Sequence, residues 1–285
     1  MTVGVSRVTD MASLFNQIYE DAVFALHEQT LGTRLVRTFT DGQGDQVRYL
    51  SEYPTITPVA VAETEDFSAP VQFTKTQLAS LTPGEIMSQV ILTDRRIMTD
   101  PQSARQDAAI EMAAGISEKI DQDILGNFNS LTGGTVGAGS STLLWGNLFA
   151  AQSILRANKV PRPYYAVLHP YGWHDLAGVA AVSATVTNAP MLQDEIMRAW
   201  YVGSVAGLDI FISANVETSG GTAAYGAVFN PSAIAFDLRK DVMMEPERDA
   251  SKRAWELNIS AMYATGVWRP TWGVQVVHDI TTPTA

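Results

Sequence analysis

The chain has 285 residues, no cysteine and a formal net charge of −11, and these features exclude several classes of protein. Without cysteine there can be no disulfide, no thiolate metal site and no cysteine nucleophile. The 19 lysines and arginines are scattered among 30 acidic residues, which argues against a protein that grips nucleic-acid phosphates. With 46% hydrophobic and 17% charged residues, the composition is that of a globular protein.

No apolar run reaches about 18 residues, so we expect no transmembrane helix. The first residues, Met1–Arg7, contain no apolar core of signal-peptide length, so secretion is not expected.

The first third of the chain predicts a helix followed by an extended arm. Residues 10–30 carry apolar side chains at helical spacing, and residues 47–53 alternate as in a strand. After a break at Pro54 and Pro58, residues 59–61 and 71–73 resume extended structure around an acidic tip. Residues 34–80 hold few large apolar side chains for their length. We therefore expect this segment to project from the body instead of filling a core.

A strand over 86–93 leads into a long helix over 101–128. Asp100 is the expected N-cap, and Pro101 fits the first helical position because its missing N–H costs nothing there. Apolar residues recur every four positions, which makes a stripe that winds around the helix. The stripe indicates a structural helix with several neighbours, and its members are Ala104, Ala108, Met112, Ile116, Ile120, Ile124 and Phe128.

The second half predicts alternating helices and strands. A glycine-rich stretch, 127–141, is expected to be a flexible surface loop, and 143–160 a second long helix. The expected elements that follow are strands at 164–168, 208–213, 223–229 and 233–237, a helical turn at 171–176 and a helix at 191–200. A strand over 255–263, a turn at Thr265-Gly266 and a partner strand containing Val274 and Val276 complete the prediction.

None of the candidate chemical motifs is complete. Gly133–Gly139 lacks the lysine of a P-loop and follows a helix, so it does not predict phosphate binding. His169 and His174 could belong to a metal site or to a serine hydrolase, but Pro170 and Gly172 interrupt a regular ligand face and no Gly-x-Ser-x-Gly is present. We interpret both histidines as half-buried residues at a strand-to-helix turn.

Acidic and aromatic clusters have similar alternatives. Glu118, Asp121 and Asp123 could be paired catalytic carboxylates, but a solvated or inter-subunit ionic face fits their helical context better. The aromatic residues of the last strands could form a ligand platform. Their alternation places Trp255 and Tyr263 in a core and leaves Trp268 and Trp272 open. We therefore predict no enzyme, no catalytic residue, no cofactor and no metal.

The order of these elements resembles the major capsid proteins of tailed bacteriophages with the Hong Kong 97-type coat fold. Pro101–Phe128, closing in Ile120-Asp121-Gln122-Asp123-Ile124-Leu125-Gly126, is similar to the spine helix of that family. Val167-Leu168-His169-Pro170-Tyr171-Gly172-Trp173 resembles the entry to the axial domain, and Gly207–Ser213 resembles its central strand.

The resemblance implies an α+β fold with four parts. These are an N-terminal arm and helix (1–37), an extended β-hairpin loop (38–80), a peripheral domain with the spine helix (81–160 and 240–285) and an axial domain with a central mixed sheet (161–239). The extended loop would overlap a neighbouring subunit. Candidate inter-subunit contacts are Arg48, Glu52, Glu63, Glu65, Asp66, Lys75, Glu118 and Asp121.

The function implied is a structural subunit that forms hexamers and pentamers and builds an icosahedral shell around double-stranded DNA. Its partners would be other copies, a portal and, in some members, a decoration protein. No long charged scaffolding segment precedes the coat region, so the chain would be either a processed product or a protein that relies on a separate scaffolding protein. It would be assembled in the host cytoplasm, reside in the virion and contact no membrane. Lys75 is the one lysine in the arm, so an autocatalytic lysine–asparagine crosslink is not expected.

Three alternatives remain at this point. An encapsulin has the same coat fold but encloses an enzyme. A hydrolase would use His169 or His174 with a serine. A tail or decoration protein would be another virion component, although such proteins seldom contain so long an internal helix.

Overall fold

The computed structural model describes residues 30–61, 63–64, 70–99, 104–182 and 203–283. The expected helices at 10–30 and 191–200 and the helix start at Asp100-Pro101 lie outside these residues. The chain divides into two compact units, and each is described by itself. The helix α4 (Ala104–Leu125) and the strands β11 (Ile234–Asp249) and β12 (Ala254–Val267) contribute to both units.

The larger unit, residues 31–84, 121–239 and 263–285, is built on a seven-stranded mixed sheet. The strand order is β5-β13-β10-β6-β8-β7, and β9 pairs with β10. These strands are β5 (Thr135–Gly137), β6 (Tyr164–Leu168), β7 (Ser204–Val205), β8 (Leu208–Ile212), β9 (Thr218–Ser219), β10 (Ala223–Phe229) and β13 (Gly273–Asp279). The β6–β8 and β5–β13 pairs are parallel, and the remaining pairs are antiparallel, which confirms the expected mixed sheet.

Helices and aromatic side chains complete the core of this sheet. The helices are α5 (Trp145–Ala157), α6 (Pro170–Val182) and the 3₁₀ turns η1 (Gly126–Ser130), η3 (Pro231–Ala233) and η4 (Pro270–Trp272). Leu148, Leu155 and Leu176 are almost fully buried against strand residues of β6, β8 and β13. The apolar face expected for the second long helix is thus confirmed.

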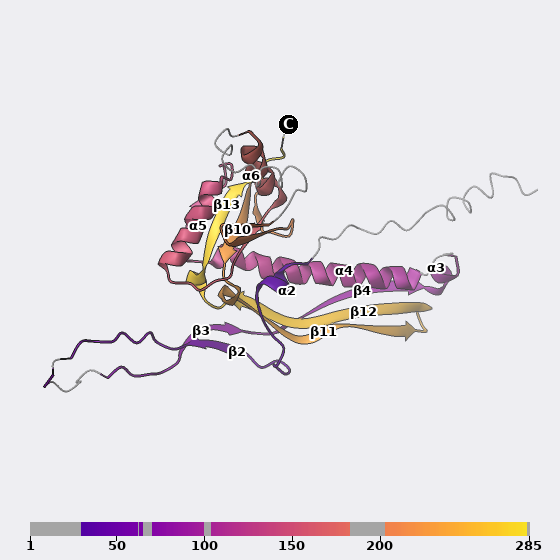
Figure 1. The fold of residues 1–285 in the computed structure, drawn as a ribbon. Coiled ribbons are helices and arrows are strands. Elements are labelled where there is room, and N and C mark those ends of the chain that lie inside the picture. Colours follow the sequence, from indigo (N-terminus) through magenta and orange to yellow (C-terminus); the bar gives the residue numbers. More distant parts are fainter. Residues whose placement is uncertain (1–29, 62, 65–69, 100–103, 183–202, 284–285) are drawn as a thin grey trace, which may run out of the picture. The chain divides into compact units, whose positions relative to one another are not determined.

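The remaining elements of the larger unit form the arm region. They are α2 (Gly32–Leu35), β1 (Arg37–Phe39), β2 (Arg48–Glu52) and β3 (Thr76–Leu81). β1 pairs in parallel with the start of β11, and β2 pairs with β3 in an antiparallel ribbon that has an irregularity between Leu50 and Ser51. Figure 1 shows residues 53–61 and 70–75 continuing beyond the ends of this ribbon.

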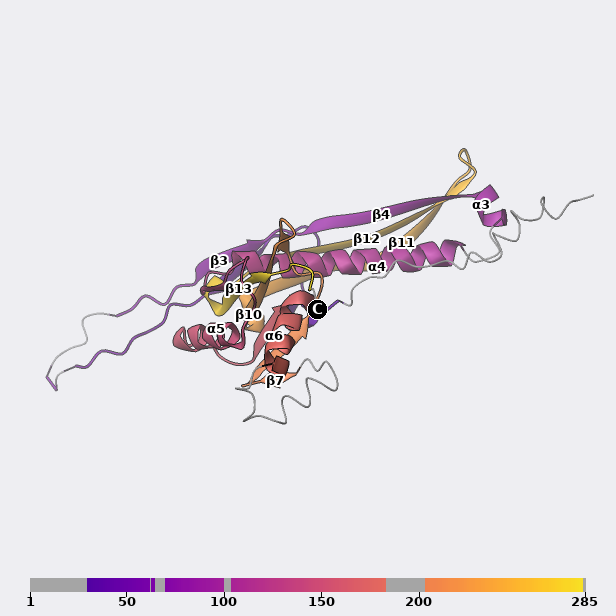
Figure 2. The same ribbon diagram turned by 90° about the horizontal axis from the view of Figure 1, so that it is seen from above.

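The smaller unit contains described residues 85–99, 104–120 and 240–262. Its sheet is made by β4 (Gly84–Thr93) beside β12, with the far part of β11 next, and α3 (Asp94–Thr99) follows β4. The helix α4 lies along one face of the sheet (Figures 1 and 2). On this helix Met112, Ile116 and Ile120 are buried, which confirms this part of the winding stripe.

Two sequence-based predictions about the strands are wrong. Thr265-Gly266 is not a turn, because β12 continues to Val267 and the chain turns at Pro270, which lacks an N–H. The strand containing Val274 does not pair with β12 but with β10 and β5. The segments 59–61 and 71–73, expected only to be extended, form no strand ladder within the described residues, and the paired segment after the tip is β3.

The glycine-rich stretch is not a flexible loop. Residues 135–137 form β5, which pairs with β13 in the register Val136↔Val276. A Cβ built on Gly133 would lie 2.4 Å from the carbonyl oxygen of Gly273. The glycine allows two backbones to approach closely, so it serves packing instead of mobility.

Candidate functional site

The most exposed apolar surface in the described arm lies beyond β2 and β3. Val59 is 65% exposed and Phe73 is 58% exposed, and Tyr53, Ile56, Val61 and Val71 are also exposed. Tyr53 and Phe73 stack with ring centroids 4.4 Å apart and planes 2° from parallel, and the Lys75 ammonium lies 5.4 Å from the Tyr53 ring centroid. Extended backbone without a strand partner and exposed apolar side chains are together typical of surfaces that bind another chain.

Where the arm begins, at the segment 41–48 and the facing residues of β11 (the root of the arm), Arg48 and Arg239 both donate hydrogen bonds to one buried carboxyl group. Asp237 of β11 has no exposed side-chain surface, and its Oδ2 accepts hydrogen bonds from Arg48 Nε at 2.9 Å and Arg239 Nη2 at 2.7 Å. Arg48 Nη2 also donates to Asp41 at 2.6 Å. The hydrogen bond to Asp237 is the main cause that raises the pKa of Arg48, and the Arg48 guanidinium lowers the pKa of Asp41.

A second contact joins the arm strand to the end of β12. Arg269 Nε lies 3.4 Å from Glu52 Oε1. The Arg269 guanidinium lies 4.7 Å from the ring centroid of Trp268 and 4.1 Å from that of Trp272. The two tryptophans therefore pack around a cation instead of forming a ligand platform.

The carboxylates of the long helix do not form a catalytic group. Asp121 is fully buried, and its oxygens accept hydrogen bonds from the backbone N–H groups of Leu31 and Gly32, at 2.9 and 2.6 Å, and from Asn215 Nδ2 at 2.9 Å. Asp121 is therefore not a solvated carboxylate, because three donors inside the larger unit occupy it, and its contact with another subunit stays an untested prediction.

Asp123 and Glu118 lie apart from this buried group. Asp123 accepts a hydrogen bond from the Tyr263 hydroxyl at 2.6 Å, and burial together with this bond raises the pKa of Tyr263. Tyr263 is buried as expected, whereas Trp255 is half-buried beneath Arg248. Glu118 is half-buried on the part of α4 in the smaller unit.

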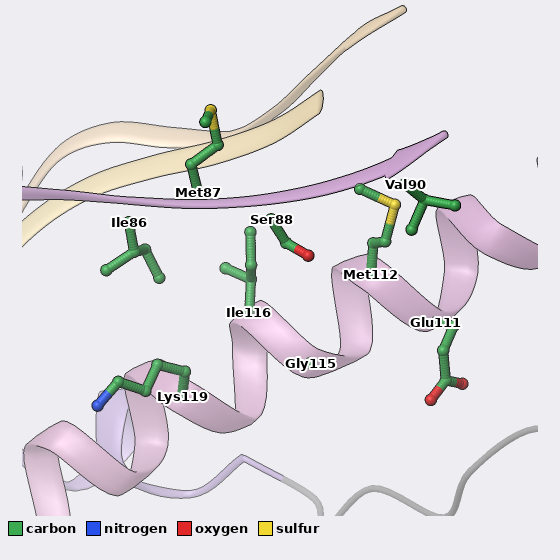
Figure 3. A pocket seen from close by; sticks show the side chains of 9 residues that line it. All are labelled: Ile86, Met87, Ser88, Val90, Glu111, Met112, Gly115, Ile116 and Lys119. Atoms are coloured by element: carbon green, nitrogen blue, oxygen red, sulfur yellow. The ribbon is translucent and has the colours of Figure 1, made fainter. Parts of the chain in front are cut away.

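A groove of about 670 Å³ opens between β4 and α4 in the smaller unit. Figure 3 shows Met112 and Ile116 pointing from the helix toward β4, and Ile86 and Ser88 pointing from β4 toward the helix. Glu111 and Lys119 flank the groove. Its walls are mainly apolar and carry no convergent set of catalytic groups.

The histidines have structural surroundings. His169 Nδ1 accepts the backbone N–H of Tyr171, and burial lowers the pKa of His169. His174 is half exposed, with its Nδ1 3.9 Å from Asp175. His278, which the sequence did not single out, is fully buried with its ring against Gly172 of α6. In the described part of the chain, no serine hydrogen-bonds to either His169 or His174.

Two searches of the described residues gave no candidates. Nowhere in residues 30–61, 63–64, 70–99, 104–182 and 203–283 do three or more His, Asp or Glu side chains gather as a metal site would require. Across the same ranges, no helix is both long enough and apolar enough to span a membrane.

The comparison with protein families identifies the chain. A family model described as "Phage capsid protein" matches residues 89–276, which is more than half of the sequence. The chain belongs to the phage capsid protein family. No curated protein matches the sequence.

Solved structures of phage capsids share the fold at low sequence identity. A structure from Mycobacterium phage Che8 is 19% identical, with 90% of this chain and 94% of that chain covered and a TM-score of 0.73. The capsid structure of the cyanophage P-SCSP1u is 16% identical, with 92% of each chain covered and a TM-score of 0.72. An acidic stable capsid structure of the Helicobacter pylori bacteriophage KHP30 is 9% identical, with 98% and 99% covered and a TM-score of 0.72.

These matches confirm the α+β coat fold of the Hong Kong 97 type and the function of a major capsid protein that forms the shell of a virion. The encapsulin alternative is not favoured. As a capsid protein, the chain assembles with copies of itself. The boundaries of the peripheral and axial domains stay a prediction, although the sheet and core of the larger unit bring α5 and β13 together with β6 and β10.

The residues of this capsid protein that are expected to contact other subunits differ in how exposed they are. Glu63 and Lys75 are exposed, Glu52 is 41% exposed beside Arg269, and Glu65 and Asp66 lie outside the described residues. Arg48 is only 18% exposed and binds two carboxylates of its own subunit, and its role as an inter-subunit contact stays a prediction.

Sequence reasoning missed the buried pair Asp237 and Arg239. An acid and a base two positions apart on a strand point to the same face, and that spacing was the available signal.

Proposed function

We propose that the exposed arm, residues 53–75, binds a neighbouring subunit and that this contact closes the protein into hexamers and pentamers of an icosahedral shell. The observation that carries the proposal is the row of exposed apolar side chains on backbone without a strand partner. Burial of one such side chain contributes about 1.5–3 kcal/mol, which gives each arm a strong reason to find a partner surface.

We further infer that the shell encloses double-stranded DNA without gripping it. The formal charge of −11 supports this, because a weakly repulsive surface does not trap the nucleic acid during packaging. Assembly would take place in the host cytoplasm with a separate scaffolding protein, a portal and possible decoration partners, and the chain itself would carry out no chemical reaction.

The test removes the apolar contact without touching the core. The double variant Tyr53→Ser with Phe73→Ser should leave the subunit folded, because both rings are about half exposed or more. It should abolish closed shells in electron micrographs and shift sedimentation from megadalton particles to small oligomers. Tyr53→Phe keeps the stacked pair and is the matched control. Normal shells from the double serine variant would refute the proposal, as would normal shells after deletion of residues 51–68.

A further inference from the structure

We propose that Arg239 is the positioning residue of the arm, because its guanidinium clamps the loop of residues 41–47 onto β11 and so fixes the direction in which the arm extends. The inference rests on the proposed function of the arm as the inter-subunit contact. It adds a residue whose side chain is almost fully buried in its own subunit and that still decides whether subunits can join.

The side chain of Arg239 makes four hydrogen bonds. Arg239 Nε and Nη2 donate to Asp237 Oδ2 at 3.0 and 2.7 Å. Its Nη1 donates to the carbonyl oxygen of Gln43 at 3.2 Å, and Nη2 also donates to that of Gln46 at 2.9 Å. The side chain is only 3% exposed. The rigid fork therefore joins β11 to two points on the loop that leads into β2.

Gly42 lies directly against the Arg239 guanidinium. A Cβ built on Gly42 would lie 2.2 Å from Arg239 Cζ and 2.4 Å from Nη1. The tip of a flexible side chain could normally move away from an added methyl group. Here four hydrogen bonds and burial hold the Arg239 guanidinium in place. The absence of a side chain at Gly42 therefore lets the loop lie directly against the guanidinium.

Arg48 and Arg269 also join β2 to the rest of the larger unit, through Asp237 and Glu52, and an apolar cluster packs beside these contacts. Leu50 and Leu81 pack with Ala235 and Ala264 in a small apolar cluster. Such burial attracts without defining a direction. Hydrogen bonds from a planar guanidinium define both distance and angle, so the clamp can orient the ribbon that the apolar cluster merely anchors.

Two single substitutions separate positioning from folding. Arg239→Lys keeps a positive charge beside Asp237 but cannot reproduce the fork to Gln43 and Gln46. Gly42→Ala keeps every charge and displaces only the guanidinium. Gly84→Ala is the matched control, because a Cβ there meets no atom within 4 Å.

The direction of the arm can be measured directly in unassembled subunits. The chain has no cysteine, so spin labels can be attached to Thr57→Cys on the arm and Ser219→Cys on β9 without competing thiols. We expect a narrow distance distribution in the parent protein and in Gly84→Ala, and a clearly broader one in Gly42→Ala and Arg239→Lys. Equal widths in all four proteins would overturn the proposal.

Assembly is measured on the same variants without labels. Gly42→Ala and Arg239→Lys should give folded subunits, with the thermal midpoint close to that of the parent, that fail to form closed shells or form shells of irregular size. Wild-type shells from both would refute the clamp. If Arg239→Lys does not fold, Gly42→Ala decides, because it leaves all charges in place.

The serine variant of Tyr53 and Phe73 is assembled in parallel. If that variant forms normal shells, the proposed function of the arm fails. If it does not and the clamp variants do, only the positioning role of Arg239 fails.

Discussion

Replacing Asp121 should destabilise the segment of residues 31–36, which precedes the arm. In Asp121→Ala, the backbone N–H groups of Leu31 and Gly32 and the side-chain amide of Asn215 all lose their acceptor. A buried donor without a partner costs about 1–3 kcal/mol. The three losses overlap because the donors can relax together, so we expect destabilisation of the larger unit by about 3–5 kcal/mol, similar to other buried polar networks from which one partner is removed.

The site of the effect can be measured as well as its size. Amide hydrogen exchange in the peptide covering residues 31–36 should accelerate by roughly 10²- to 10³-fold, since about 1.4 kcal/mol corresponds to a factor of ten. Urea unfolding of unassembled subunits should show a lower midpoint. Exchange in β6 and β8 should rise less, because those strands lie in the centre of the seven-stranded sheet.

Asp121→Asn is the matched control. Its Oδ1 can still accept from Leu31 and Gly32, and only the contact with Asn215 must rearrange, so the expected loss is about 1–2 kcal/mol. The reasoning is refuted if the alanine variant lies within about 0.5 kcal/mol of the parent, or if the asparagine variant is as unstable as the alanine variant.

Two other predictions concern packing in the larger unit. Burial lowers the pKa of His278, so the unfolded state binds more protons, and the stability of the fold should decrease as the pH drops below about 6.5. The variant His278→Gln should make stability depend less on pH when unfolding is measured between pH 5 and 8. An unchanged slope would contradict the prediction. Gly133→Ala should destabilise the protein by about 1–3 kcal/mol in thermal unfolding, because the new Cβ would meet the carbonyl of Gly273. In the control Gly126→Ala the Cβ meets no atom within 4 Å, so this variant should not be destabilised. Equal thermal midpoints for the two variants would show that β5 can move aside.

The elements that the sequence predicted well are those whose pattern is local. The strands at 164–168 and 223–229 have the expected bounds, and the helix α5 lies within the expected range. Each has either a continuous apolar run or a clear helical face, so the signal is contained in the segment itself.

The wrong predictions depend on partners that are far away in the sequence. β13 pairs with β10 and β5, and nothing within residues 273–279 distinguishes these partners from the nearer β12. The glycine stretch resembles a loop when taken alone, and only the approach of Gly133 to Gly273 explains it. Asp121 looks solvated by composition because its three donors come from residues 31–32 and 215.

The position of the arm in the sequence was predictable, but the contacts that hold it were not. A shortage of core residues between 34 and 80 correctly indicated an arm, and its apolar side chains are indeed exposed. The sequence did not predict that Arg48 binds Asp237, because that residue is nearly two hundred positions away.

The energetics of the arm explain why a clamp at its root matters for assembly. Burying one of its apolar side chains contributes about 1.5–3 kcal/mol, while ordering one residue of backbone costs about 1–2 kcal/mol. In an extended segment only alternate residues face a partner, so the gain from each buried residue nearly equals the cost of ordering two. Binding by a fully flexible arm would therefore be marginal. The arm is restricted before it binds by Pro54, by Pro58 and by the stack of Tyr53 on Phe73, and its first residues are restricted by Arg239. Most of the entropy cost of ordering the arm is therefore met within the subunit, and the exposed side chains remain available to join subunits.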